Sequence, residues 1–156
     1  MHASTTSITI VREPITHPGG SLKVVAVPAD RWQLAKLRWR ATATDGREFG
    51  FDLSKPLRHQ DVICANDYSI YVVEQLPEPV VVFERNDDHD ACALAWSIGN
   101  LHQPLQVTRD ELIAPDDPAL RQITEQFDVK HRSEIRVFQP IRNTVRHTHG
   151  HHHHHH

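Results

Sequence analysis

The sequence predicts an α+β protein with a β-rich first half, a mixed second half and a histidine-rich tail. Three observations carry this prediction. Apolar residues in the first half alternate with a period of two, which is typical of half-buried strands. The prolines at Pro77 and Pro79 then interrupt the pattern, and beyond them strand-like and helix-like segments alternate. The chain ends in a run of histidines at residues 151–156.

The first half, residues 1–75, is expected to form a small antiparallel β domain. Asp45-Gly46 joins two alternating runs, which is a strong hairpin signal, and a turn at residues 66–68 joins two more. The only helical signal is a single turn near residues 29–35. The expected strands cover residues 7–11, 21–27, 37–44, 49–53, 61–65 and 69–74.

Residues 76–80 are expected to be a linker, because paired prolines disfavour both a helix and a central strand. Residues 81–140 then follow the order β-α-β-β-α-β. The segments cover residues 80–85, 86–102, 105–108, 111–114, 116–127 and 134–139. This order is that of a ferredoxin-like domain, in which two helices cover one face of an antiparallel sheet. Residues 141–156 are expected to be a flexible tail.

Each expected helix carries its own start signal. Asp87 or Asp88 can act as the N-cap of the first helix, and its apolar residues recur at i, i+3, i+4 and i+7 between Ala91 and Ile98. The second helix opens with Asp117 as the N-cap and a proline in its first position. Both helices are therefore expected to bury one face against the sheet.

Composition excludes several classes of function. The formal charge of −3 makes no electrostatic case for binding nucleic acid or an anionic membrane. No apolar run reaches the roughly 20 residues that cross a bilayer, and no secretory signal is visible, so a cytoplasmic protein is expected. Cys64 and Cys92 are expected to be packed residues rather than a disulfide scaffold. No nucleophile set or phosphate-binding glycine loop is recognisable, so no enzyme activity is expected.

His102 is the residue that raises the functional question. Helical periodicity places it four residues after Ile98, on the buried-facing stripe, in a helix expected to reach about residue 103. One interpretation is a packed histidine that bonds to a backbone carbonyl. The other is a metal ligand at the margin of an apolar patch, where a two-fold axis would bring two copies together. Two imidazoles suit Zn²⁺, Cu²⁺ or Ni²⁺ but do not complete a coordination shell.

The tail offers further imidazoles. Its candidate ligands are His147, His149, His151, His152, His153, His154, His155 and His156. Such a run indicates either metal binding or an appended purification tag, and both interpretations stay open for residues 151–156. A tethered tail has a high effective concentration near His102 and could complete the shell there.

Four stretches identify a family. They are RATATDGREFGFDL at residues 40–53, LRHQDVI at 57–63, LPEPVVVF at 76–83 and GNLHQPLQV at 99–107, of which the last is the most specific. The chain resembles the UreE family of urease accessory proteins, which are nickel metallochaperones. The resemblance implies a peptide-binding-like first domain, a ferredoxin-like metal-binding domain and a homodimer formed through the second domain. It also implies that His102 binds Ni²⁺ at the dimer interface, with Zn²⁺ or Cu²⁺ possible in vitro. The implied partners are the urease GTPase accessory protein and the apo-urease assembly complex.

Two departures from the family pattern bear on the site. Leu101 stands where the family often has arginine, and Asp117-Pro118 stands where the second helix often begins Asp-His, so no second fixed site is expected there. His89 and Cys92 lie at i, i+3 and are interpreted as a solvated histidine and a packed cysteine. The alternative function is a protein-interaction module without metal that carries an appended tag. A metalloenzyme is disfavoured, because no three-ligand set with a general base is visible.

Overall fold

The protein has a mixed α+β structure in which strands predominate, as the sequence predicts. The computed structural model describes residues 7–127 and 129–142 of the 156-residue chain. The chain divides into two compact units. The first consists of Met1–Pro79 and Glu134–Phe138, and the second of Val80–Ser133 and Gln139–His156.

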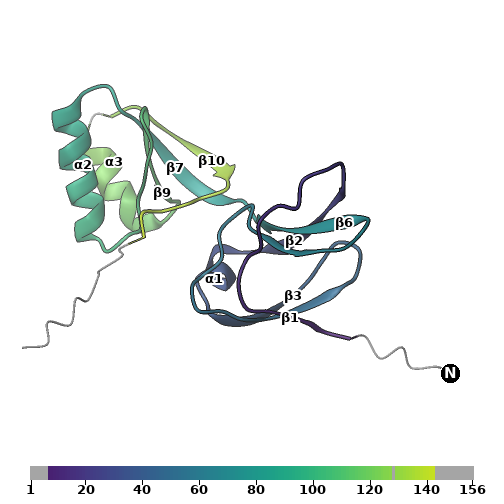
Figure 1. Cartoon of the computed structure of the whole chain (residues 1–156). Coiled ribbons are helices and arrows are strands. Elements are labelled where there is room, and N and C mark those ends of the chain that lie inside the picture. Colours follow the sequence, from purple (N-terminus) through teal and green to yellow (C-terminus); the bar gives the residue numbers. More distant parts are fainter. Residues whose placement is uncertain (1–6, 128, 143–156) are drawn as a thin grey trace, which may run out of the picture. The chain divides into compact units, whose positions relative to one another are not determined.

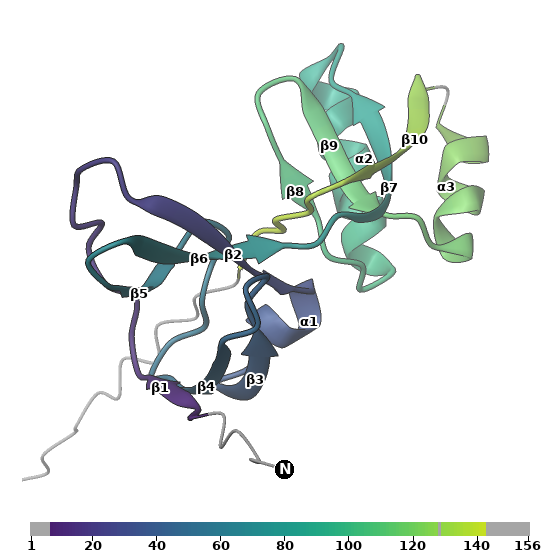
Figure 2. The same ribbon diagram turned by 90° about the vertical axis from the view of Figure 1, so that its right-hand side faces the viewer.

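The first unit contains two three-stranded sheets and one short helix (Figure 2). One sheet has the order β1-β4-β3 and the other the order β2-β6-β5. The elements are β1 (Thr9–Val11), β2 (Lys23–Ala29), α1 (Arg31–Leu34), β3 (Arg38–Thr42), β4 (Glu48–Asp52), β5 (Val62–Ala65) and β6 (Ser69–Gln75). Both predicted hairpins are confirmed, because β3 pairs antiparallel with β4 and β5 pairs antiparallel with β6.

The prediction of a purely antiparallel first domain is wrong. Strand β1 pairs parallel with β4, and β2 pairs parallel with β6. A short loop forces the two strands of a hairpin to be antiparallel, whereas strands far apart in the chain can pair in either direction. The local pattern therefore predicted the hairpins correctly and left the direction of the two long-range pairings undetermined.

The core of the first unit is built from the inward positions of these strands. The Trp39 and Phe51 rings stack with centroids 4.0 Å apart, and Phe49 lies 5.1 Å from Tyr71. Phe49 and Leu57 are fully buried. At the start of α1, the Asp30 side chain accepts a hydrogen bond from Gln33 N, and Asp30 N donates one to Gln33 Oε1, which makes a capping box.

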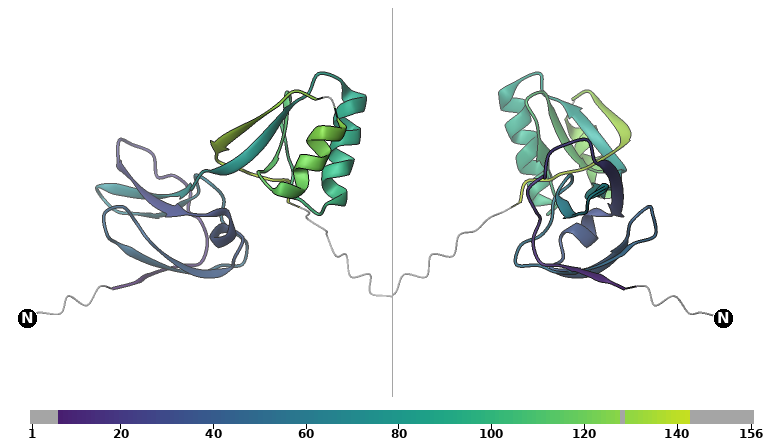
Figure 3. Two further views of the ribbon diagram at one scale, coloured as in Figure 1. Left: turned by 180° about the vertical axis from the view of Figure 1, so that it is seen from behind. Right: turned by 45° about the vertical axis from the view of Figure 1, so that its right-hand side comes forward.

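The second unit has one four-stranded sheet with the order β10-β7-β9-β8. Its elements are β7 (Glu78–Glu84), α2 (Asp88–Asn100), β8 (Gln106–Val107), β9 (Glu111–Pro115), the 3-10 helix η1 (Pro118–Leu120), α3 (Arg121–Gln126) and β10 (His131–Arg136). Figures 1 and 3 show α2 and α3 side by side on the same face of this sheet. The element order follows the predicted β-α-β-β-α-β pattern.

Several predicted boundaries differ from the structure. Strand β7 begins at Glu78, so residues 78–80 are extended in a strand rather than in a linker. Pro79 precedes the ladder to β9, which begins where Val80 faces Pro115, so its missing N–H removes no bond from that ladder. Strand β10 lies three residues earlier than expected, at His131–Arg136.

The apolar stripe of α2 is buried as predicted. Leu94 and Ile98 have 1% and 0% of their surface exposed, and they pack against Phe83 of β7 and Ile123 of α3. Full burial of one such side chain contributes about 1.5–3 kcal/mol to stability. No helix among the described residues combines the length and the apolar character needed to span a membrane.

Candidate metal centre

His102 lies just outside α2, at a tight chain reversal. The helix ends at Asn100, with Leu101 as the C-cap, rather than near residue 103 as predicted. His102 N donates to Gly99 O at 2.9 Å, and Gln103 N donates to Ile98 O at 3.4 Å. These two bonds are those of a Schellman motif, in which the reversing residue is usually glycine in the left-handed conformation. Here His102 takes that conformation, with a φ of 56°.

The imidazole is exposed, which corrects its predicted position on the buried stripe. Helical periodicity holds only while the backbone is helical, and it ends two residues before His102. The interpretation as a packed histidine is therefore wrong for the single chain. Within the described part of the chain, no hydrogen bond or ion pair occupies the His102 side chain, so both ring nitrogens are available.

Histidine at this position has an energetic cost. A left-handed residue other than glycine costs roughly 1–2 kcal/mol, although histidine tolerates the conformation better than most residues. Among the described residues other than glycine, only Gln60, with a φ of 72°, shares it. Glycine would adopt this conformation at lower cost, so the backbone geometry alone does not account for a histidine at this position.

The electrostatic setting favours a cation. The C-terminal end of a helix carries partial negative charge on its last carbonyls. The last turn of α2 contains no basic residue to compete for it. An exposed imidazole at this end can donate a nitrogen lone pair to a dication, but one imidazole cannot hold it alone.

The end of the described chain lies next to the loop that follows His102. Ile141 N donates to Leu105 O at 2.8 Å, and Gln139 N donates to the Gln106 side chain at 2.7 Å. In Figures 1 and 3 the segment after β10 runs back to the end of this unit where α2 finishes. The predicted tail ligands, His147, His149 and residues 151–156, lie outside the described residues.

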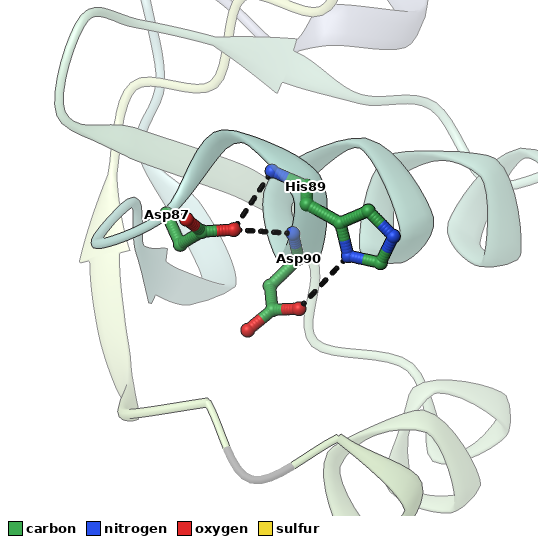
Figure 4. Close-up of side chains that lie close together, drawn as sticks. All are labelled: Asp87, His89 and Asp90. Atoms are coloured by element: carbon green, nitrogen blue, oxygen red, sulfur yellow. Dashed lines mark hydrogen bonds and ion pairs between the residues drawn. The ribbon is translucent and has the colours of Figure 1, made fainter.

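A second group of side chains of the types that can ligate a metal lies at the opposite end of α2. Asp87, His89 and Asp90 are exposed, and their ligand atoms lie within 4.8 Å of one another (Figure 4). Sequence reasoning did not group these residues, although three side chains of two ligand types, carboxylate and imidazole, within four positions of a helix start were the available signal.

The chemistry of this group is that of a helix start. Asp87 accepts hydrogen bonds from His89 N at 2.8 Å and Asp90 N at 3.1 Å, so it is the N-cap. The partial positive charge of a helix N-terminus opposes a cation at the same place.

Cys92 is exposed and Cys64 is half-buried, so the prediction of a packed Cys92 is wrong.

Comparison with known proteins decides the family. Residues 78–156 match the family model described as UreE urease accessory protein, C-terminal domain. The chain belongs to the UreE family. This confirms the resemblance drawn from the GNLHQPLQV motif, and the matched region contains both His102 and the tail.

Individual UreE proteins match at moderate identity. The urease accessory protein UreE of Haemophilus influenzae (strain PittEE) is 30% identical over 132 residues, which cover 77% of this chain and 70% of the relative. That of Acinetobacter baylyi is 29% identical over 119 residues, covering 74% and 75%. That of Chelativorans sp. (strain BNC1) is 32% identical over 90 residues, so the match spans 56% of this chain and 57% of that relative.

Proposed function

We propose that this protein is a nickel-binding metallochaperone that delivers Ni²⁺ during assembly of the urease active site. The observation that carries the proposal is the exposed imidazole of His102, held in a left-handed conformation at the end of α2. Membership of a urease accessory family supports a role as a carrier rather than as an enzyme. The metal is the cargo of this protein, so it must be held by ligands from which it can leave.

The proposed centre joins two copies of the chain. One His102 from each copy supplies two imidazoles, and a homodimer formed through the second unit brings them together. The His102 pair is the central, tight site and the tail histidines are auxiliary ligands. The bond from Ile141 N to Leu105 O supports this auxiliary role because it starts the tail beside the His102 loop. Zn²⁺ or Cu²⁺ would occupy the same ligands in vitro, and Cu²⁺ binds imidazole more tightly, so selectivity for nickel comes from supply and partners.

The proposed organisation has a peptide-binding-like first domain at residues 1–75, a ferredoxin-like second domain whose first strand is β7 from Glu78, and a histidine-rich tail at residues 141–156. The sheet order β10-β7-β9-β8 with both helices on one face supports the ferredoxin-like assignment. The proposed partners are the urease GTPase accessory protein and the apo-urease assembly complex, and the proposed location is the cytoplasm.

Calorimetry with Ni²⁺ tests the proposal. A chain ending at Val145 removes the tail histidines, and we expect it to retain one tight nickel ion per dimer. His102→Ala should abolish this site, whereas His89→Ala, which removes an exposed histidine at the other end of α2, should keep it. Sedimentation in the same buffer measures whether each variant forms a dimer.

Two results would contradict the proposal. Tight binding that survives in His102→Ala would refute the assignment of the ligand. If the chain ending at Val145 binds no stoichiometric nickel, the alternative function is favoured instead, which is a protein-interaction module without metal and with an appended tag.

A further inference from the structure

The outward face of α2 carries two unlike residues about one turn apart. Trp96 has 71% of its surface exposed, and Gly99, also exposed, follows it by three positions. Residues three and four positions apart lie on the same side of a helix, so Trp96, Gly99 and Asn100 share this face. Leu94 and Ile98 point the other way, into the core of the second unit. The outward face therefore combines a large protruding side chain with a position that has no side chain.

The space above Gly99 is open in the single chain. Gly99 has the negative φ of an ordinary helical residue, so its backbone conformation does not require glycine. A Cβ placed there would lie more than 4 Å from the described atoms outside its own helix backbone and chain neighbours. Alanine would therefore fit at this position, and it would favour the helix, because glycine weakens a helix relative to alanine. The surface at Gly99 is a gap that a group from outside this chain can approach closely.

The edges of the sheet in the second unit are a poorer contact for a second copy. The edge strand β8 is two residues long. The edge strand β10 carries Arg132, which makes an ion pair of 2.6 Å with Glu111. Short strands and charged side chains at an edge oppose pairing with another chain. The exposed tryptophan makes the outward face of α2 the better surface for association.

We propose that the outward face of α2 packs against a second copy of this chain, with Trp96 of each copy lying over Gly99 of the other. A two-fold contact uses the same patch on both copies, so the patch must be complementary to itself. A protruding side chain beside a gap meets this condition. Tryptophan is also among the residues that contribute most to protein interfaces. The inference rests on the proposed dimer and names the surface and the residues that form it.

The position of His102 explains why the occupant is a second copy. Gly99 O accepts the hydrogen bond from His102 N at 2.9 Å, so the loop that carries the imidazole begins where this face ends. One copy offers one imidazole there, and one imidazole cannot hold a metal ion alone. Packing of the two α2 faces brings a second His102 loop to the same place. Leu101, which has 38% of its surface exposed, extends the apolar surface towards His102.

Sedimentation equilibrium on the full chain, first with a chelator and then with Ni²⁺, tests the inference. Trp96→Ala should raise the Kd of the dimer about thirtyfold, the loss expected for a tryptophan at the centre of an interface. Gly99→Ala should raise this Kd about tenfold, because the added methyl group occupies space that the second copy fills. The same change should raise the Tm of the dilute monomer, because alanine favours the helix. The matched control is Trp32→Ala in the first unit, where the tryptophan is 66% exposed, and it should leave the Kd unchanged.

The outcomes separate this inference from the proposed function. An unchanged dimer Kd in both Trp96→Ala and Gly99→Ala overturns the inference, and tight nickel binding by the parent would then require a different interface. A parent that stays monomeric with and without Ni²⁺ overturns both the inference and the proposed centre. If both variants weaken the dimer but the parent binds no nickel tightly, the interface is supported and the nickel function fails. Gly99→Ala alone decides the interface if Trp96→Ala does not fold.

Discussion

Replacing His102 by glycine should raise the stability of the metal-free protein and remove its response to nickel. Glycine relieves a left-handed conformation that costs roughly 1–2 kcal/mol. Glycine also raises the conformational entropy of the unfolded chain, which takes back about 0.4–1 kcal/mol of this gain in stability. The hydrogen bonds of the reversal use only backbone atoms, so they survive the change. The expected net gain is about 0.5–1 kcal/mol, or about 1–4 °C in Tm for a chain of this size.

Nickel should reverse this order of stability. A ligand at 100 times its Kd stabilises the folded state by about 2.7 kcal/mol. The assay is thermal unfolding of the chain ending at Val145, with and without Ni²⁺. The Tm of His102→Gly should be higher than that of the parent without metal and lower than that of the parent with metal. Gln60→Gly is the matched control, because Gln60 is also left-handed, in a turn closed by the bond from Asp61 N to Arg58 O. It should gain stability in both conditions.

Either of two results would refute this reasoning. If His102→Gly is less stable than the parent without metal, the left-handed conformation carries no strain and the argument for the side chain fails. If nickel stabilises His102→Gly as much as the parent, His102 is not a ligand.

Three further predictions concern the elements that position the site. Asp87→Ala should lower the stability by about 1 kcal/mol, measured by urea unfolding, because it removes the N-cap of α2, while nickel binding at His102 is retained. Ile98→Ala should cost about 2–5 kcal/mol in the same assay, since that side chain is fully buried, and a cost below 1 kcal/mol would contradict its place in the core. The pKa of the Asp45 carboxyl lies below its ordinary value of 3.8, first because Arg47 N donates to it and then because the Tyr71 hydroxyl does. A lowered pKa contributes stability above pH 3.8 that is lost as the pH falls further, so the difference in stability between the parent and Asp45→Asn should shrink below pH 3.8 and be constant at neutral pH.

The features that the sequence predicted correctly are those that depend on neighbours in the chain. Asp45-Gly46 specified the hairpin of β3 and β4, because the turn of a hairpin is determined by only a few consecutive residues. The spacing from Ala91 to Ile98 specified the buried face of α2, and Asp87 its start. Four short stretches, of which GNLHQPLQV is the most specific, were enough to indicate the family, because a motif of consecutive residues is recognised without knowledge of the fold.

Tertiary structure decided the features that depend on distant parts of the chain. The parallel pairing of β1 with β4 and of β2 with β6 joins segments that no short loop constrains. The exposure of His102 follows from the point at which the helix stops, and a pattern of apolar residues does not reveal a left-handed residue. The hydrogen bond from the Gln75 side chain to Phe138 O joins residues that are 63 positions apart in the chain. Local periodicity is determined by the geometry of a single helix or strand. Strand direction, chain reversal and hydrogen bonds between distant residues are determined by which surfaces meet when the whole chain packs.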